Sequence, residues 1–137
     1  MMGEIRGGCN CGAVRYELAR PAIMVAVCHC RNCRRQSGSA FSVNMIVPMQ
    51  AMALTGDLTT YEDHDTESGR PVLRQFCSGC GTPLCSLSAN SPGLAIIKVG
   101  TADEPEHFVP TMHIWTSTAL PWVSLDASLP HFPKNPQ

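Results

Sequence analysis

Cys77-Ser78-Gly79-Cys80-Gly81 and Cys9-Asn10-Cys11-Gly12 are the two stretches that decide the predicted fold of this chain. The first is a C-x-x-C-G sequence, in which a tight turn brings two thiolates together and the glycines permit backbone conformations that other residues resist. In the second, residues two apart point to the same side of an extended backbone, so both sulfurs can reach one ion. The four thiolates predict a closed, tetrahedral, structural zinc site that ties the start of the chain to its middle. A redox C-x-x-C pair would need a thioredoxin-like βαβ context, which the sequence does not offer.

A second group of cysteines lies in Cys28-His29-Cys30-Arg31-Asn32-Cys33. Cys28 and Cys30 share one face of an extended chain, and Cys33 returns to it if the chain turns directly after Cys30, whereas His29 would point the other way. Three protein ligands leave the fourth position of a zinc ion to water or substrate, as in catalytic sites. Three thiolates also make a soft, electron-rich site, which suits the capture of an incoming thiol in its deprotonated form.

The surroundings of this second group leave two questions open. A side chain could occupy the fourth position instead, and His29, His113 and Cys85 are the candidates for such a closed structural site. Arginines also flank the last cysteine, where a guanidinium could screen the thiolates or bind a carboxylate in bidentate fashion, or form no more than a solvated basic turn. We predict that the pocket for the thiol substrate is formed near the open position by Arg34, Ser37 and Gly38.

Length and composition exclude several classes of protein. The chain has 137 residues, of which 44% are hydrophobic and 15% charged, as expected for one folded domain spanning residues 1–137. The formal net charge of -1 provides no basic field for nucleic acid or an anionic membrane, and no apolar run is long enough to span a bilayer. With no signal-peptide pattern at the start, we expect a cytoplasmic protein, in which clustered cysteines bind metal more often than they form disulfides.

Short apolar runs separated by turn residues predict a mainly β, antiparallel architecture with little helix. Eleven prolines and eleven glycines leave little room for long helices, so we expect one helical turn at Arg31–Ser37 and a looser one at Ala102–His107. Residues 129–137, with three prolines, are expected to form a surface tail. The predicted strands are Ala13–Leu18, Ile23–Cys28, Phe41–Val47, Leu58–Tyr61, Val72–Phe76, Leu84–Leu87, Leu94–Val99 and Met112–Trp115.

Three ordered blocks carry a resemblance to a known family. They are G-x-C-x-C-G-x-V-x-Y from Gly7 to Tyr16, C-H-C-x-x-C-R-x-x-S-G-x-x-F from Cys28 to Phe41, and F-C-x-x-C-G-T-P-L from Phe76 to Leu84. The chain resembles the glutathione-dependent formaldehyde-activating enzyme family, which includes centromere protein V, over nearly its whole length. The resemblance implies a β-tent fold stapled by zinc, two zinc ions per chain, and the same division of cysteines into a structural and a catalytic set.

The resemblance also implies an activity. In the founding reaction of the family, glutathione adds to formaldehyde to give S-(hydroxymethyl)glutathione, which places the family among the carbon–sulfur lyases. We therefore expect a small thiol and a small aldehyde as partners, with a zinc-stapled binding module without turnover as the alternative. Cys85 is not a ligand in the family pattern and is interpreted as a small buried hydrophobe. His113 is expected to be structural or to line the pocket, and exposed loop positions are expected for His64, His107 and His131.

Overall fold

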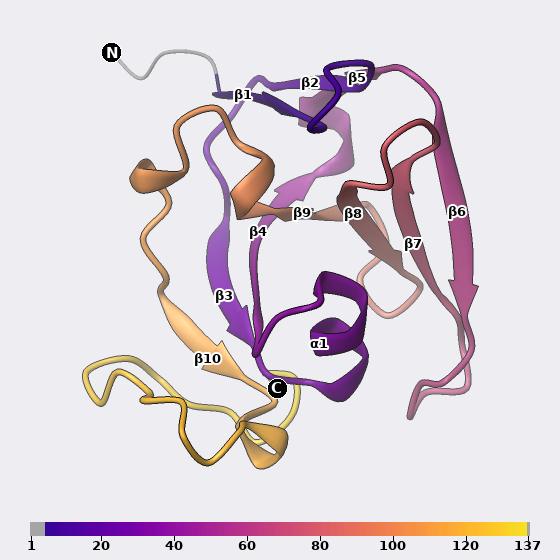
Figure 1. The fold of residues 1–137 in the computed structure, drawn as a ribbon. Coiled ribbons are helices and arrows are strands. Elements are labelled where there is room, and N and C mark those ends of the chain that lie inside the picture. The colour runs from indigo at the N-terminus through magenta and orange to yellow at the C-terminus, as the bar shows by residue number, and fades with distance from the viewer. Residues whose placement is uncertain (1–4, 137) are drawn as a thin grey trace.

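The computed structural model describes residues 5–136, and this part of the chain is mainly β. Ten strands form two sheets, and one short α-helix, α1 (Arg31–Ser37), is joined by four turns of 3-10 helix (Figure 1). The strands are β1 (Ile5–Gly8), β2 (Arg15–Leu18), β3 (Met24–Cys28), β4 (Ser42–Pro48), β5 (Met52–Thr55), β6 (Leu58–Asp63), β7 (Val72–Cys77), β8 (Pro83–Ser88), β9 (Leu94–Lys98) and β10 (Met112–Ile114).

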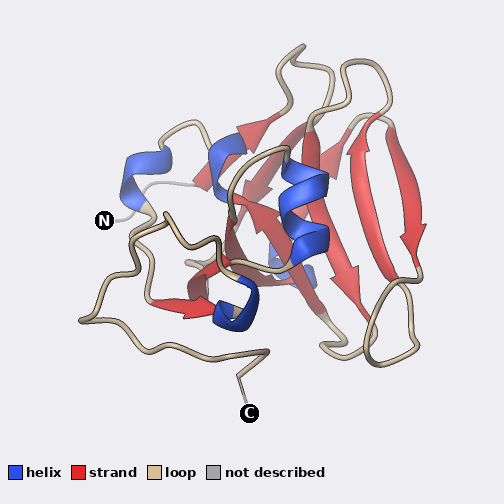
Figure 2. Cartoon of the chain, turned by 60° about the horizontal axis from the view of Figure 1, so that its bottom comes forward, coloured by secondary structure: helices blue, strands red, loops and turns tan. Residues whose placement is uncertain are grey.

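The two sheets differ in size and in their place in the fold. The smaller sheet has the order β1-β2-β5, and the larger has the order β10-β3-β4-β9-β8-β7-β6. In Figure 1 the small sheet lies across the top, while β3 and β4 on one side and β6, β7 and β8 on the other descend as two walls. Helix α1 lies between these walls at their lower end, and Figure 2 shows it in front of the large sheet. The mainly β fold predicted from the sequence is thereby confirmed.

Several details differ from the sequence-based expectations. The short strands β1 and β5 were not predicted, and the expected antiparallel arrangement is wrong at one edge, where β10 runs parallel to β3 with Met112 opposite Ala26. A parallel neighbour needs a long connection, and here the chain from β3 to β10 passes through most of the fold. Helix α1 has the predicted bounds, whereas the looser helix is reduced to a 3-10 turn at Pro105–His107.

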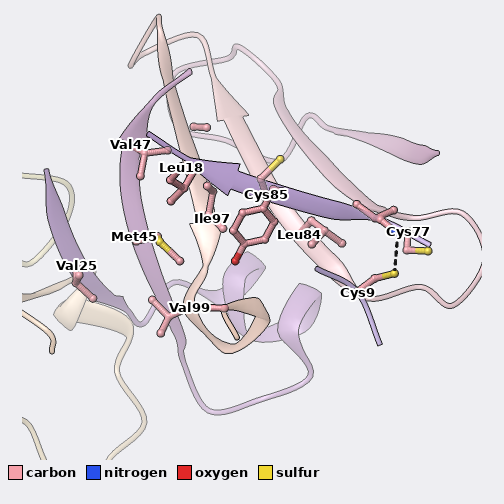
Figure 3. Close-up of a cluster of buried hydrophobic side chains, with 14 residues drawn as sticks. Cys9, Leu18, Val25, Met45, Val47, Cys77, Leu84, Cys85, Ile97 and Val99 are labelled. Carbon is pink, nitrogen blue, oxygen red and sulfur yellow. Dashed lines mark hydrogen bonds between the residues drawn. The ribbon is translucent and has the colours of Figure 1, made fainter. Parts of the chain in front are cut away.

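One face of the large sheet packs against the small sheet and forms the apolar core. Met45, Val47 and Ile97 contribute side chains that are at most 1% exposed, and Figure 3 shows Leu18 of the small sheet among them. At the other end of this cluster, the labelled side chains of Cys9 and Cys77 lie close together. The four-cysteine group therefore lies at the edge of the core instead of in a separate lobe.

The opposite face of the large sheet carries buried polar residues. Directly opposite residues in paired strands share a face, and residues two apart along a strand do as well. The register pairs Cys28 with Ser42, Asn44 with Lys98, and Ser86 with Arg74. The intervening apolar residues, such as Met45 and Ile97, point into the core. We call this second side the polar face; its buried members are Cys28, Ser42, Asn44, Arg74, Ser86 and Lys98.

The C-terminal segment follows strand β10 along the surface. His113 donates its backbone N–H to the carbonyl of Pro130 at 3.0 Å and accepts at its own carbonyl from Phe132 at 2.9 Å. Trp115 N–H donates to the carbonyl of Lys134 at 3.2 Å. The described part of the predicted tail is therefore held to the edge of the sheet by backbone hydrogen bonds, while residue 137 lies outside the described residues. Between residues 5 and 136 we find no helix with the length and hydropathy needed to cross a bilayer.

Candidate metal centres

Four cysteines from two distant parts of the chain converge at one end of the fold. Cys9 follows β1 and Cys77 ends β7, and the sulfurs of Cys9, Cys11, Cys77 and Cys80 all lie within 4.8 Å of one another. The Cys9 and Cys11 sulfurs are 3.6 Å apart and the Cys11 and Cys77 sulfurs 3.8 Å apart. A tetrahedral zinc ion with Zn–S bonds of about 2.3 Å requires sulfurs about 3.8 Å apart, so the set fits zinc.

Backbone N–H groups support these sulfurs in the way expected for thiolates. Val14 N–H donates to the Cys9 sulfur at 3.2 Å, and this hydrogen bond lowers the pKa of Cys9. Gly79 and Cys80 donate their N–H groups to the Cys77 sulfur at 3.3 and 3.4 Å, which is the local result of the C-x-x-C turn. The Thr82 hydroxyl, 3.2 Å from the Cys80 sulfur, lowers the pKa of Cys80 to about 5. These hydrogen bonds favour the deprotonated ligands that a metal ion needs. Cys11 differs: a backbone hydrogen bond from Ala13 lowers its pKa, but the neighbouring Cys9 and Cys80 sulfurs outweigh this effect and raise the pKa to about 11.

The second group consists of three cysteines around the start of α1. Cys28 ends β3, Cys30 caps the helix and accepts a hydrogen bond from Cys33 N–H at 3.2 Å, and Cys33 lies on the buried side of the helix. Their three sulfurs also lie within 4.8 Å of one another. Hydrogen bonds from Cys28 and Cys30 lower the pKa of Cys33. The donor set fits a zinc ion held by three thiolates, and within residues 5–136 no other histidine, cysteine or carboxylate joins it.

None of the three candidate fourth ligands joins the three-cysteine set. His29 is fully buried with its Nε2 3.0 Å from Nδ1 of His113, and Asp126 N–H donates to Nε2 of His113 at 3.2 Å. Because His113 Nε2 is an acceptor, a neutral His113 carries its proton on Nδ1 and donates it to His29. Cys85 is buried and donates to the Gln75 side-chain oxygen at 3.1 Å, in agreement with its interpretation as an internal residue.

The remaining histidines have the exposure expected from the sequence. His64, His107 and His131 are exposed. Glu104, Glu106 and His107 form a third group that could hold a metal ion, but all three are exposed on one turn, and His107 pairs with Glu104 at 3.4 Å. Exposed acidic groups of this kind are common on protein surfaces, so we assign no role to this one.

Two of the three residues predicted to bind the thiol substrate line one pocket of the structure. A pocket of about 400 Å³ is open to solvent beside α1, and Arg34 and Gly38 line it, but Ser37 does not. The Ser37 hydroxyl donates instead to the carbonyl of Arg34 at 3.4 Å. Arg34 Nε is buried and has no hydrogen-bond partner among the described residues. The other lining residues are Arg31, Arg35, Ser39, Ala40, Leu120 and Trp122.

Sequence reasoning missed the charged residues buried beside the three cysteines. Arg74 donates from Nε to Asp63 at 2.7 Å, and Asp63 also accepts from Asn32 of α1, so the helix is tied to β6 and β7. Lys98 is 7% exposed; burial lowers its pKa, while attraction to the Cys33 thiolate opposes this effect. The one available signal was a lysine inside the apolar run Leu94–Val99.

Comparison with known proteins gives consistent matches to one family. The family model described as "Glutathione-dependent formaldehyde-activating enzyme" matches residues 4–118. Relatives provisionally named for this activity include one from Penicillium rubens, 29% identical over 110 residues, and one from Halomonas elongata, 24% identical over 128 residues. The matches cover 74% and 90% of this chain; they span only 56% of the Penicillium protein and 82% of the Halomonas protein. A crystal structure of a Rhodobacter sphaeroides protein has a TM-score of 0.55 at 20% identity, covering 93% of this chain and 98% of that one, which supports the fold alone.

Proposed function

The chain belongs to the glutathione-dependent formaldehyde-activating enzyme family, and we propose that it joins a small thiol such as glutathione to formaldehyde or a related small aldehyde. In this reaction the S–H bond of the thiol and the π bond of the carbonyl break, a sulfur–carbon bond forms, and the carbonyl oxygen takes up one proton in place of the one that the thiol loses. The product is a hemithioacetal, which for formaldehyde is an S-(hydroxymethyl) thiol adduct. The reverse reaction breaks the carbon–sulfur bond, so the enzyme is classed as a carbon–sulfur lyase. The identity of the thiol and of the aldehyde is part of the proposal.

The observation that carries the proposal is the contrast between the two cysteine sets. Both sets bring sulfurs within 4.8 Å, but one contains four ligands and the other contains three, with no fourth ligand atom found in the described part of the chain. A tetrahedral ion is saturated by the first set and keeps one position free in the second. We therefore assign a structural zinc to Cys9, Cys11, Cys77 and Cys80 and a catalytic zinc to Cys28, Cys30 and Cys33.

The residues around the three-cysteine set prepare it for a thiol. A zinc ion bound there would supply a position at which an incoming thiol loses its proton at neutral pH. The Cys33 N–H group donates a hydrogen bond to the Cys30 sulfur. The short helix positions Cys33 near the end of β3, so the three ligands keep a fixed arrangement. Such fixed positioning lowers the entropic cost of bringing two reactants together.

The arginine-lined pocket is the proposed location of the thiol's carboxylate groups. Three guanidinium groups line it, of which Arg31 pairs with Asp65 at 3.4 Å while Arg34 and Arg35 have no ion-pair partner among residues 5–136. A planar guanidinium binds a carboxylate through two parallel hydrogen bonds, which a peptide thiol such as glutathione can accept. Arg34 follows the last cysteine of the set directly, so the pocket and the metal position share one short helix.

The proposal is tested by comparing one cysteine from each set. Cys30→Ser should retain most of the fold, lose about one zinc per chain and abolish adduct formation from glutathione and formaldehyde, followed by NMR against the uncatalysed reaction. Cys77→Ser should unfold the domain, because a structural zinc contributes about 10 kcal/mol or more, comparable to the whole stability of a domain. If Cys30→Ser turns over like the unmodified chain, the catalytic assignment is wrong, and a binding module without turnover becomes the better description.

A further inference from the structure

The polar face contains three buried residues whose side chains have unused hydrogen-bonding capacity within the described part of the chain. Lys98, Asn44 and Ser86 are 7%, 4% and 3% exposed. Asn44 lies directly opposite Lys98 in the β4–β9 pair, and Ser86 is opposite Ile96, two residues before Lys98 on the same face. Opposite residues have Cβ atoms about 5 Å apart, and diagonal neighbours are within reach of a lysine side chain. The three polar groups therefore gather at one place on the sheet.

Each of these residues has a side-chain atom without a hydrogen-bond partner among residues 5–136. The side-chain oxygens of Asn44 and Ser86 are buried with no hydrogen bond, and the Lys98 ammonium makes no hydrogen bond or ion pair within residues 5–136. A buried polar group left unpaired destabilises the fold, and a buried cation does so strongly. Arg74, on the same face, is neutralised by Asp63, whose carboxylate oxygen lies 2.7 Å from Nε of Arg74. Among residues 5–136, no carboxylate pairs with Lys98 in this way.

The unpaired groups lie beside the three-cysteine set. Cys28 is opposite Ser42, and Asn44, two residues further along β4, donates to the Ser42 hydroxyl at 3.1 Å. The path from Cys28 through Ser42 and Asn44 to Lys98 stays on one face of three adjacent strands. Burial lowers the pKa of Lys98, and attraction to the Cys33 and Cys28 thiolates opposes this effect.

From this arrangement we propose that Lys98 and Ser86 bind the carbonyl oxygen of the aldehyde and stabilise the negative charge that it acquires when sulfur adds. The inference rests on the proposed function, for which it names the residues that stabilise the oxyanion. Two hydrogen-bond donors aimed at one developing oxyanion are a common and effective catalytic device. Asn44 lies directly opposite Lys98 and has a free side-chain oxygen. We expect this oxygen to accept a hydrogen bond from the ammonium group when the aldehyde is bound, which would make Asn44 a positioning residue.

The charge balance explains why a fixed cation is useful at this place. During addition the sulfur–carbon bond forms, the π pair moves to oxygen, and one unit of negative charge moves from sulfur to oxygen with no change in the total. The thiol proton, released to solvent on binding, is returned from solvent to the alkoxide. A buried ammonium group next to the oxygen stabilises the product of this charge transfer more than the reactant, and only such differential stabilisation accelerates the step.

The subsite is tested with formate, a small oxyanion that does not react, as the probe. Zinc-loaded wild-type chain, Lys98→Met and Ser86→Ala are titrated with formate by calorimetry, and their zinc content and adduct-forming rates are measured. Lys134→Met is the matched control, because Lys134 is an exposed lysine that pairs with Glu67 at 2.8 Å. We expect Lys98→Met to bind formate at least tenfold more weakly and to lose about a hundredfold or more in kcat, with zinc content unchanged. Ser86→Ala should show smaller losses of the same kind.

Different results would overturn different parts of the argument. Unchanged formate affinity in Lys98→Met would show that formate binds elsewhere, for example at the metal, and would refute the subsite. If Lys98→Met loses zinc in proportion to its loss of activity, Lys98 balances the charge of the thiolates, and the subsite is refuted as well. If the wild-type chain forms no adduct but binds formate through Lys98, the proposed function fails and the subsite stands. If the wild-type chain forms the adduct and Lys98→Met forms it at the same rate, the proposed function stands and the subsite fails.

Discussion

Breaking the buried ion pair between Asp63 and Arg74 should destabilise the fold far more than breaking a shorter pair on the surface. Both side chains are 8% exposed, and the Asp63 carboxylate also accepts hydrogen bonds from Asn32 at 3.0 Å and from Asp65 N–H at 3.1 Å. Removing one partner leaves the other charge buried without compensation, which costs about 3–5 kcal/mol. We therefore expect Asp63→Asn to lower the free energy of unfolding by about 3 kcal/mol.

The surface pair of Arg15 and Asp103 supplies the control. Its contact is shorter, at 2.6 Å, but the two side chains are 46% and 48% exposed. Asp103→Asn should cost less than about 1 kcal/mol, because water solvates the charge that remains. Urea unfolding with zinc in excess measures both variants, and the double variant Asp63→Leu/Arg74→Met should recover much of the loss. Equal losses in the two aspartate variants, or strictly additive losses at the buried pair, would refute the view that burial decides the magnitude.

Three further predictions follow from burial, close packing and metal binding. Burial raises the pKa of Cys85 to about 11, so at pH 8 this thiol should resist iodoacetamide in the folded chain and react only on unfolding, as peptide mapping by mass spectrometry would reveal. Gly7→Ala should lower the urea midpoint strongly, because its Cβ would lie within 2.4 Å of the Tyr16 side chain, whereas Gly100→Ala, with open space around it, should change stability by no more than about 1 kcal/mol. A strong chelator should unfold the chain, and zinc but not magnesium should restore its circular dichroism, because thiolates prefer zinc.

Short-range features of the fold could be predicted from the sequence. The division of seven cysteines into two sets depends on spacings of two or three residues, and the structure brings together the same two sets. Helix α1 was found for a similar reason, since the turn after Cys30 is a local requirement of the C-x-x-C spacing. The predicted zinc at each set, and the roles assigned to the two ions, stay predictions until metal content is measured.

Features that depend on distant partners were missed. Strand β1 consists of Ile5-Arg6-Gly7-Gly8 and has no alternating pattern, so only its pairing with β2 makes it a strand. Strand β10 is three residues long, and its parallel pairing with β3 follows from the path of the whole chain. The burial of Lys98 could not be seen either, because lysine is usually exposed and its place on the polar face depends on the pairing of β9 with a distant strand.

The two cysteine sets also differ in how far apart their members lie along the chain, and this sets an order for metal loading. Cys28 to Cys33 fit within six residues, so a nascent or unfolded polypeptide can already chelate an ion there. Cys11 and Cys77 meet across a separation of 66 residues, so their ion can bind only after most of the chain has been synthesised and folded. An ion that also binds the unfolded chain adds little stability, whereas one that requires closure of a long loop adds its full binding energy. During zinc shortage, the four-cysteine site should therefore lose its ion first. The chain should then unfold before the three-cysteine site loses its ion.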